Sequence, residues 1–192
     1  TKKTKTKTVK AKVTPIPKLP AIPFAFEVLD AASKQRTKAR KIEVLQRYPH
    51  DSIMALLIWN FDETVISLLP EGDVPYGNTR EDNSATGTLS DKINDAVSKM
   101  SEMDSTSLGA QDQGKASIRK EYTKFYNFLK GGNDGLNSLR RETMFINILE
   151  GLHPLEAEIL ILVKDKKLSD KYKITKEIAS AAYPQITWGG RS

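Results

Sequence analysis

Two histidines, His50 and His153, are the first residues to test for metal or acid–base chemistry, because the chain has no cysteine. His50 follows a proline and His153 precedes one, so each stands at a junction between segments. No pair of carboxylates lies next to either histidine with a helical spacing that would bring metal ligands together. We interpret both as capping or junction residues, and we expect no metal site and no cofactor.

A glycine-rich stretch, LKGGNDG at residues 129–135, precedes a predicted helix and could in principle bind an anion. It lacks the Walker spacing of glycine, lysine and hydroxyl, and no strand precedes it. A turn between two helices needs the same glycines, so we interpret the stretch as a turn. The chain also has no G-x-S-x-G elbow. We therefore expect that the protein is not an enzyme.

Nucleic acid is a stronger candidate ligand, because SIRKEYTKFYNFLKGG alternates basic residues with aromatic rings. Single strands are held by base stacking on aromatic rings beside a cationic track. The same aromatic spacing is typical of a helix that packs on a hydrophobic core, and this second interpretation is favoured. The candidate nucleic-acid face consists of Arg119, Lys120, Lys124, Lys130, Arg140 and Arg141.

The first 23 residues form the clearest functional feature, since they hold seven lysines, four prolines and no acid. Lysines without arginine attract an acidic surface or a phosphate backbone without bidentate recognition. The prolines favour an extended path, so the arm could reach roughly 75 Å. A stiff spacer or a solubilising tail would also explain this composition. The candidate partner-binding residues are Lys2, Lys3, Lys5, Lys7, Lys10, Lys12, Ile16, Lys18, Leu19 and Ile22.

The last five residues, WGGRS, form a smaller candidate contact made by Trp188 and Arg191. The Trp188 ring either folds back on the body or is offered to a partner. The sequence leaves both alternatives open.

The charge of the chain is concentrated in the arm. The whole chain has a net charge of +6, and the arm carries seven positive charges, so the remainder is close to neutral at −1. The basic composition therefore does not indicate a basic folded surface. No apolar run approaches the roughly 20 residues that span a bilayer, and no secretory signal is recognised.

Helical periodicity predicts the elements that position these residues. Residues 24–48 read as one bent helix or two short ones, Asp51 is a predicted N-cap for SIMALLIWNF, and Asp62 for ETVISLL. Thr88 and Asp91 resemble a capping box for a short amphipathic helix. Residues 71–117 are otherwise acidic and rich in turn formers, and we interpret them as an insertion.

The second half of the chain is strongly helical. A helix is predicted from Ile118 to the glycine turn, and Asp134 is a predicted cap for the next one. Pro154 suits the first turn of LEAEILILVKDKKL, whose basic end complements the helix dipole, and Thr175 is a predicted cap for KEIASAAY.

Four long and distinctive stretches carry a family resemblance: FEVLDAASKQRTKARKIEVLQRY, ALLIWNFDETVISLLPEGDVPY, FYNFLKGGNDGLNSLRRETMFINILEGLHPLEAEILILVKDKKLSDKYKITKEI and WGGRS. Over residues 24–70 and 118–192 the chain resembles a protein family encoded by T4-like tailed bacteriophages, notably cyanophages of marine cyanobacteria. Residues 78–115 fit this resemblance less well. The resemblance implies a phage protein made in the host bacterial cytoplasm, and it implies no activity or site residue.

We therefore expect an all-α fold with about six to eight short helices in a single domain at residues 24–192, preceded by the extended arm at 1–23. The predicted function is that of a non-enzymatic, minor structural protein of the virion. The arm would attach it to a capsid, neck or tail subunit through protein–protein interaction. The alternative is a nucleic-acid-associated accessory factor in phage replication, packaging or transcription. No membrane partner is expected.

Overall fold

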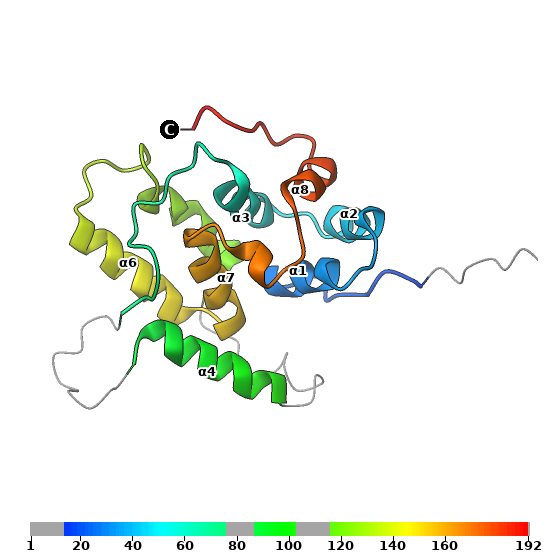
Figure 1. The fold of residues 1–192 in the computed structure, drawn as a ribbon, viewed down its shortest axis with the longest axis horizontal. Helices are drawn as coiled ribbons and strands as arrows, with labels where there is room; N and C mark the ends of the chain where they lie inside the picture. The colour runs from blue at the N-terminus through cyan, green and yellow to red at the C-terminus, as the bar shows by residue number, and fades with distance from the viewer. Residues whose placement is uncertain (1–13, 76–86, 103–115, 192) are drawn as a thin grey trace, which may run out of the picture.

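The computed structural model describes residues 14–75, 87–102 and 116–191 (Figure 1). In these residues the chain forms eight α-helices and two short 3-10 helices, and the only strand-like pairing is an isolated antiparallel bridge between Ser67 and Leu129. This confirms the all-α class. The elements are α1 (Ala25–Ser33), α2 (Lys38–Arg47), α3 (Asp51–Phe61), α4 (Leu89–Glu102), α5 (Ile118–Glu121), η1 (Tyr122–Phe128), α6 (Ser138–Gly151), α7 (Pro154–Lys164), η2 (Leu168–Asp170) and α8 (Lys176–Ala182).

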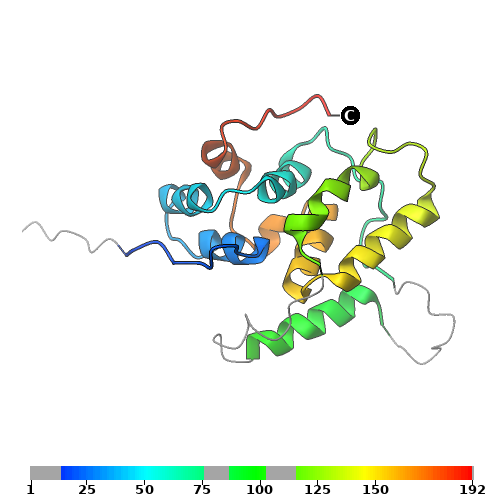
Figure 2. The ribbon, with the colours of Figure 1, turned by 180° about the vertical axis from the view of Figure 1, so that it is seen from behind.

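Helix α7 lies at the centre of the fold and packs against α1, α3, α4 and α6 (Figures 1 and 2). Its sequence is apolar around most of its circumference, which is typical of a helix that is covered on several sides. Ile159, Leu160 and Val163 are fully buried there. Among the described helices, none combines the length and the apolar composition that crossing a bilayer requires.

Several helices begin where local chemistry predicts. The imidazole of His50 accepts a hydrogen bond from the Ser52 amide at 3.0 Å, and that of His153 accepts one from Leu155 at 3.1 Å, so both histidines are N-caps. Thr175 caps α8 as predicted. The prediction for Asp51 was wrong by one position, since this residue is the first of α3 and His50 is the cap.

Two other predicted caps were also wrong. Residues 62–69 form no helix, because the Asp62 carboxylate accepts hydrogen bonds from its own turn, at the amide and hydroxyl of Thr64, while Ser67 pairs with Leu129. Helix α6 is capped by Asn137, whose side chain accepts from the Arg140 amide at 2.8 Å, and Asp134 remains in the turn.

The described part of residues 71–117 contributes to the core. Thr88 and Asp91 form the predicted reciprocal hydrogen bonds at the start of α4. Leu89 and Ile93 then join the hydrophobic core, and α4 packs along α7. The interpretation of this segment as an insertion remains a prediction, but α4 does more than cover the surface.

The aromatic residues before the glycine turn lie in a short α-helix, α5, that continues as the 3-10 helix η1. Phe125 and Phe128 are buried and contact the Trp59 ring, whereas Tyr126 is 54% exposed. Most of the aromatic spacing therefore reflects core packing, as the favoured interpretation of the sequence states.

Candidate functional site

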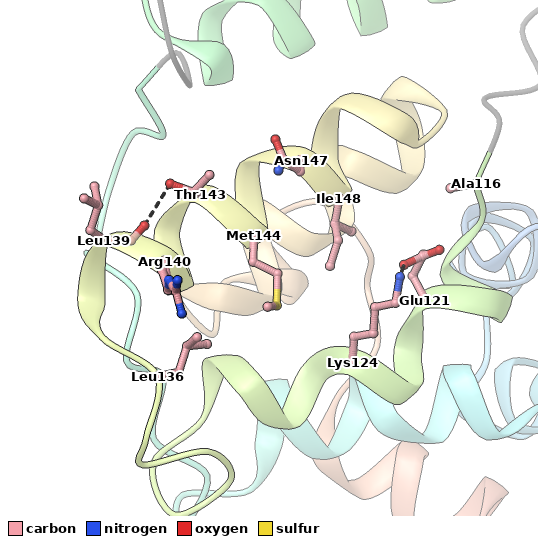
Figure 3. Close-up of a pocket in the computed structure, with 10 residues that line it drawn as sticks. All are labelled: Ala116, Glu121, Lys124, Leu136, Leu139, Arg140, Thr143, Met144, Asn147 and Ile148. Atoms are coloured by element: carbon pink, nitrogen blue, oxygen red, sulfur yellow. Dashed lines mark hydrogen bonds and ion pairs between the residues drawn. The ribbon is translucent and has the colours of Figure 1, made fainter.

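A groove with a volume of about 750 Å³ lies between the α5–η1 segment and α6 (Figure 3). We call it the α6 groove. Met144 and Ile148 lie one helical turn apart on α6 and form its floor, because side chains at i and i+4 share a helix face. The lining residues are Ala116, Glu121, Lys124, Leu136, Leu139, Arg140, Thr143, Met144, Asn147 and Ile148.

The rim of the α6 groove is charged. Lys124 forms an ion pair with Glu121 at 2.7 Å across one turn of the α5–η1 segment. Arg140 is exposed on the other side, and among the described residues its guanidinium has no ion-pair partner. The Thr143 hydroxyl donates to the carbonyl of Leu139 within α6. An apolar floor with a polar rim is the anatomy of a protein interface and not of a catalytic centre.

Arg141 differs from its neighbour, although both belong to the candidate nucleic-acid face. Its side chain is only 6% exposed. The guanidinium donates to the carbonyls of Asn127 at 2.9 Å, Leu136 at 2.8 Å and Asn133 at 3.4 Å. Arg141 therefore holds the glycine turn against α6 and does not face solvent, which corrects its assignment to a nucleic-acid face.

The remaining basic residues of that face do not form one track. Arg119 is half-buried near His50, whose pKa is lowered by burial and by the positive charge of Arg119. Lys120 is exposed on α5. Lys130 lies at the glycine turn, in a separate shallow pocket that Tyr126 and Arg191 also line.

The glycine turn is built by close backbone contacts. Gly131 has φ of +82°, a value that L side chains rarely adopt, and a Cβ on Gly132 would lie 1.9 Å from the carbonyl oxygen of Tyr126. This accords with the interpretation of the stretch as a turn.

The proline-rich part of the arm lies on the body of the protein. The Tyr48 hydroxyl accepts a hydrogen bond from the Leu19 amide at 3.0 Å and donates one to the Pro17 carbonyl at 3.1 Å. The Arg40 guanidinium donates to the Thr14 carbonyl. Ile16 and Leu19 are half-buried against the core.

Two members of the candidate arm site remain on the surface, since Lys18 is exposed and Ile22 is 73% exposed. The six lysines of residues 2–12 lie outside the described residues. The structure thus separates the arm into a segment fixed on α2 and a lysine-rich segment that precedes it.

The C-terminal segment also folds back on the body. Trp188 packs partly against the core, and the Lys176 ammonium lies 5.2 Å from the centre of its ring. Arg191 donates to the Asp62 carboxylate at 2.7 Å. Of the two alternatives for Trp188, the structure shows the folded-back one.

Asp62 is the anchor of this C-terminal segment, a role that its sequence context does not reveal. Burial opposes its ionisation, but hydrogen bonds from Thr64, Gly189 and Arg191 outweigh that effect and lower its pKa to about 2. Nearby, the Lys166 ammonium donates to the carbonyls of Trp59 at 2.8 Å and Asp62 at 2.9 Å. Lys166 therefore caps the end of α3 as well as following α7.

Glu156 is a second structural carboxylate that sequence reasoning missed. It is fully buried, and its two oxygens accept the amides of Ala25 and Ile118, each at 3.2 Å. These amides begin α1 and α5, so one side chain of α7 satisfies the starts of two other helices. Burial raises the pKa of Glu156 to about 7, against the opposing effect of the two amides.

Comparison with known proteins gives one match. Residues 28–103 and 104–170 match DUF6433, described as a family of unknown function. The chain belongs to the DUF6433 family. No curated protein and no solved structure matches it. The DUF6433 match extends from α1 to η2, so it includes the α6 groove, Arg141 and Glu156, whereas the arm and the C-terminal segment lie outside it.

Proposed function

We propose that this DUF6433 protein is a non-enzymatic interaction protein of a tailed bacteriophage, a minor structural component of the virion. Its lysine-rich segment attaches it to a neighbouring capsid, neck or tail subunit, and the helical body is the part that is attached. The phage setting rests on the sequence resemblance described above. The attachment rests on the way in which the arm meets the body.

The observation that carries this proposal is the fixed position of residues 14–23. Tyr48 and Arg40 hold the backbone of this segment on the surface of the body, through Leu19, Pro17 and Thr14. The lysines of residues 2–12 therefore leave the body from one defined point. A cationic segment that starts from a fixed point reaches a partner surface with a smaller loss of entropy than one on a flexible linker.

The charge distribution supports a purely electrostatic contact. Residues 2–12 carry six lysines and no acid. Each lysine near an anionic surface contributes on the order of 1 kcal/mol, as measured for lipid surfaces. Six such contributions suffice for attachment without a shaped pocket.

The direct test counts the copies of the protein per purified virion by quantitative mass spectrometry. One variant replaces the six lysines of residues 2–12 by glutamine. The matched control replaces Thr1, Thr4, Thr6 and Thr8 by glutamine, which changes the same segment and keeps its charge. We expect the lysine variant to be lost from virions and the threonine variant to be retained. Equal retention of both variants would refute the attachment.

The second candidate is a nucleic-acid-associated accessory factor in phage replication, packaging or transcription. One observation favours it: the exposed Tyr126 ring shares a shallow pocket with Lys130 and Arg191. Binding to single- and double-stranded DNA should then weaken with salt, with a log-log slope of up to about 0.9 per phosphate contacted. Salt-dependent DNA binding by a protein that is absent from virions would favour this candidate over the first.

A further inference from the structure

Leu139 stands out on the surface of the described residues, where it is the most exposed of the large hydrophobic side chains, at 75%. It lies in the first turn of α6, at one end of the α6 groove (Figure 3). An exposed leucine beside an apolar groove costs solubility unless another surface covers it. The groove and the leucine therefore belong to one interface.

The two ends of the α6 groove carry opposite charges. Leu139 and Arg140 lie at one end, whereas Ala116 and Glu121 lie at the other (Figure 3). The Glu121 carboxylate already contacts Lys124, but Arg140 has no acidic partner among the described residues. A partner for this surface must present an apolar side chain, a carboxylate at one end and a cation at the other.

We propose that the partner is a second copy of this chain, whose α6 packs antiparallel across the groove. In a two-fold pair each copy offers the same patch, so residue i of one copy contacts residue j of the other and the reverse. Leu139 and Ile148 are equally distant from the midpoint at Thr143 and Met144, with about 14 Å between them along the helix. Each Leu139 then covers the Ile148 end of the opposite groove.

The charges fit the same arrangement. The antiparallel orientation brings Arg140 of one copy to the Glu121 end of the other, and this happens twice per dimer. Like charges remain apart, because the cationic and anionic ends lie on opposite sides of the two-fold axis. The surface is thus complementary to itself in shape, in hydrophobicity and in charge, which is the argument for a second copy and against an unrelated protein.

The interface is expected to be of modest strength. Stable interfaces usually bury about 800 Å² on each partner, and a single helix with its groove lies at the small end of this range. We expect dimers to form at micromolar concentrations. Sedimentation velocity of the full chain, from low to high micromolar concentration, measures this directly.

Leu139→Asp is expected to weaken self-association by at least about tenfold, because the carboxylate would enter an apolar floor. The matched control is Ile22→Asp, which changes an equally exposed aliphatic residue of the arm and should leave association unchanged. Circular dichroism checks that both variants fold. A wild-type chain that stays monomeric, or a dimer that Leu139→Asp leaves unaffected, would overturn the proposal.

A cysteine cross-link tests the antiparallel orientation, and it is easily interpreted because the chain has no cysteine of its own. Thr143→Cys should form a disulfide-linked dimer on mild oxidation, since this residue lies beside the two-fold axis. Glu150→Cys should not, because its two copies would lie about 20 Å apart, beyond the reach of a disulfide. Cross-linking of Glu150→Cys in preference to Thr143→Cys would refute the orientation.

Charge reversal tests the Arg140 contact separately. Arg140→Glu alone is expected to weaken the dimer, and adding Glu121→Arg in the same chain should restore most of the affinity. Failure of the double variant to recover any affinity would overturn the proposed pairing of these two residues.

Discussion

Replacing Glu156 by glutamine should remove a large part of the dependence of stability on pH. This residue is fully buried and accepts the first amides of α1 and α5, each at 3.2 Å. Burial penalises its charged form more than the two amides stabilise it, and raises its pKa from 4.5 to about 7. Glutamine has nearly the same shape and no charge to titrate.

The sign and size of the effect follow from linkage. Because the pKa of Glu156 is higher in the folded protein, the unfolded chain releases its proton first as the pH rises. The wild type therefore loses stability between pH 4.5 and about pH 7, and this loss stops above pH 7. The size of the pKa rise corresponds to roughly 3 kcal/mol.

Urea denaturation monitored by the buried Trp59 measures the free energy of unfolding across this pH range. Relative to the wild type, Glu156→Gln should gain about 3 kcal/mol as the pH rises through this window. Other titrating groups, such as His50 and Asp62, are common to both proteins and cancel. Glu150→Gln removes an exposed carboxylate of α6 and controls for the loss of one charge.

The reasoning fails if the two stability curves stay parallel across this range of pH. A constant offset between them would mean that the amides of Ala25 and Ile118 accommodate the charged carboxylate without a penalty from burial. The absolute offset itself is not diagnostic, since it depends on how the glutamine amide meets the two N–H groups.

Three further variants address the glycine turn and the arm. Arg141→Met should destabilise the fold by about 3 kcal/mol, because three carbonyls lose their donor, whereas Arg140→Met should change stability by less than about 0.5 kcal/mol; thermal denaturation measures both. Gly132→Ala should cost at least about 2 kcal/mol in the same assay, because its Cβ would overlap the Tyr126 carbonyl. Tyr48→Phe should accelerate hydrogen exchange at the Leu19 amide, measured by NMR, because the amide loses its acceptor.

Each of these variants has a matched control or a contrary outcome. Gly135→Ala has space for its Cβ, with the nearest heavy atom at 3.8 Å, and should be nearly neutral. Tyr126→Phe removes a hydroxyl from an exposed ring and should not alter exchange at Leu19. Equal effects of Arg140→Met and Arg141→Met would contradict the structural role assigned to Arg141. Unchanged exchange in Tyr48→Phe would show that the arm is not held at this point.

The all-α class and several helix starts follow from sequence because they depend on neighbours within one turn. Thr88 with Asp91, Thr175 and the two histidines act on amides two or three residues away, so residue type and spacing are sufficient to predict them. The spacing of Phe125 and Phe128 likewise indicates a core-facing helix.

The predictions failed where a side chain has a distant partner. Asp62 has the residue type of an N-cap, but its carboxylate also binds the Gly189 amide and the Arg191 guanidinium, 127 and 129 positions away. Ile16 and Leu19 look available for a partner in an extended arm, and the fold places them against its own core. Long-range hydrogen bonds and packing decided these cases, and neither is encoded in local spacing.

Arg140 and Arg141 show the division most clearly. The sequence by itself determined that two arginines start a helix after a glycine turn, because the signals for both elements are local. Only the tertiary structure decided that one is exposed beside an apolar groove and the other is buried under three carbonyls. The physical reason is that adjacent helical residues point about 100° apart, so the path of the preceding loop sets which of them meets the protein and which meets water.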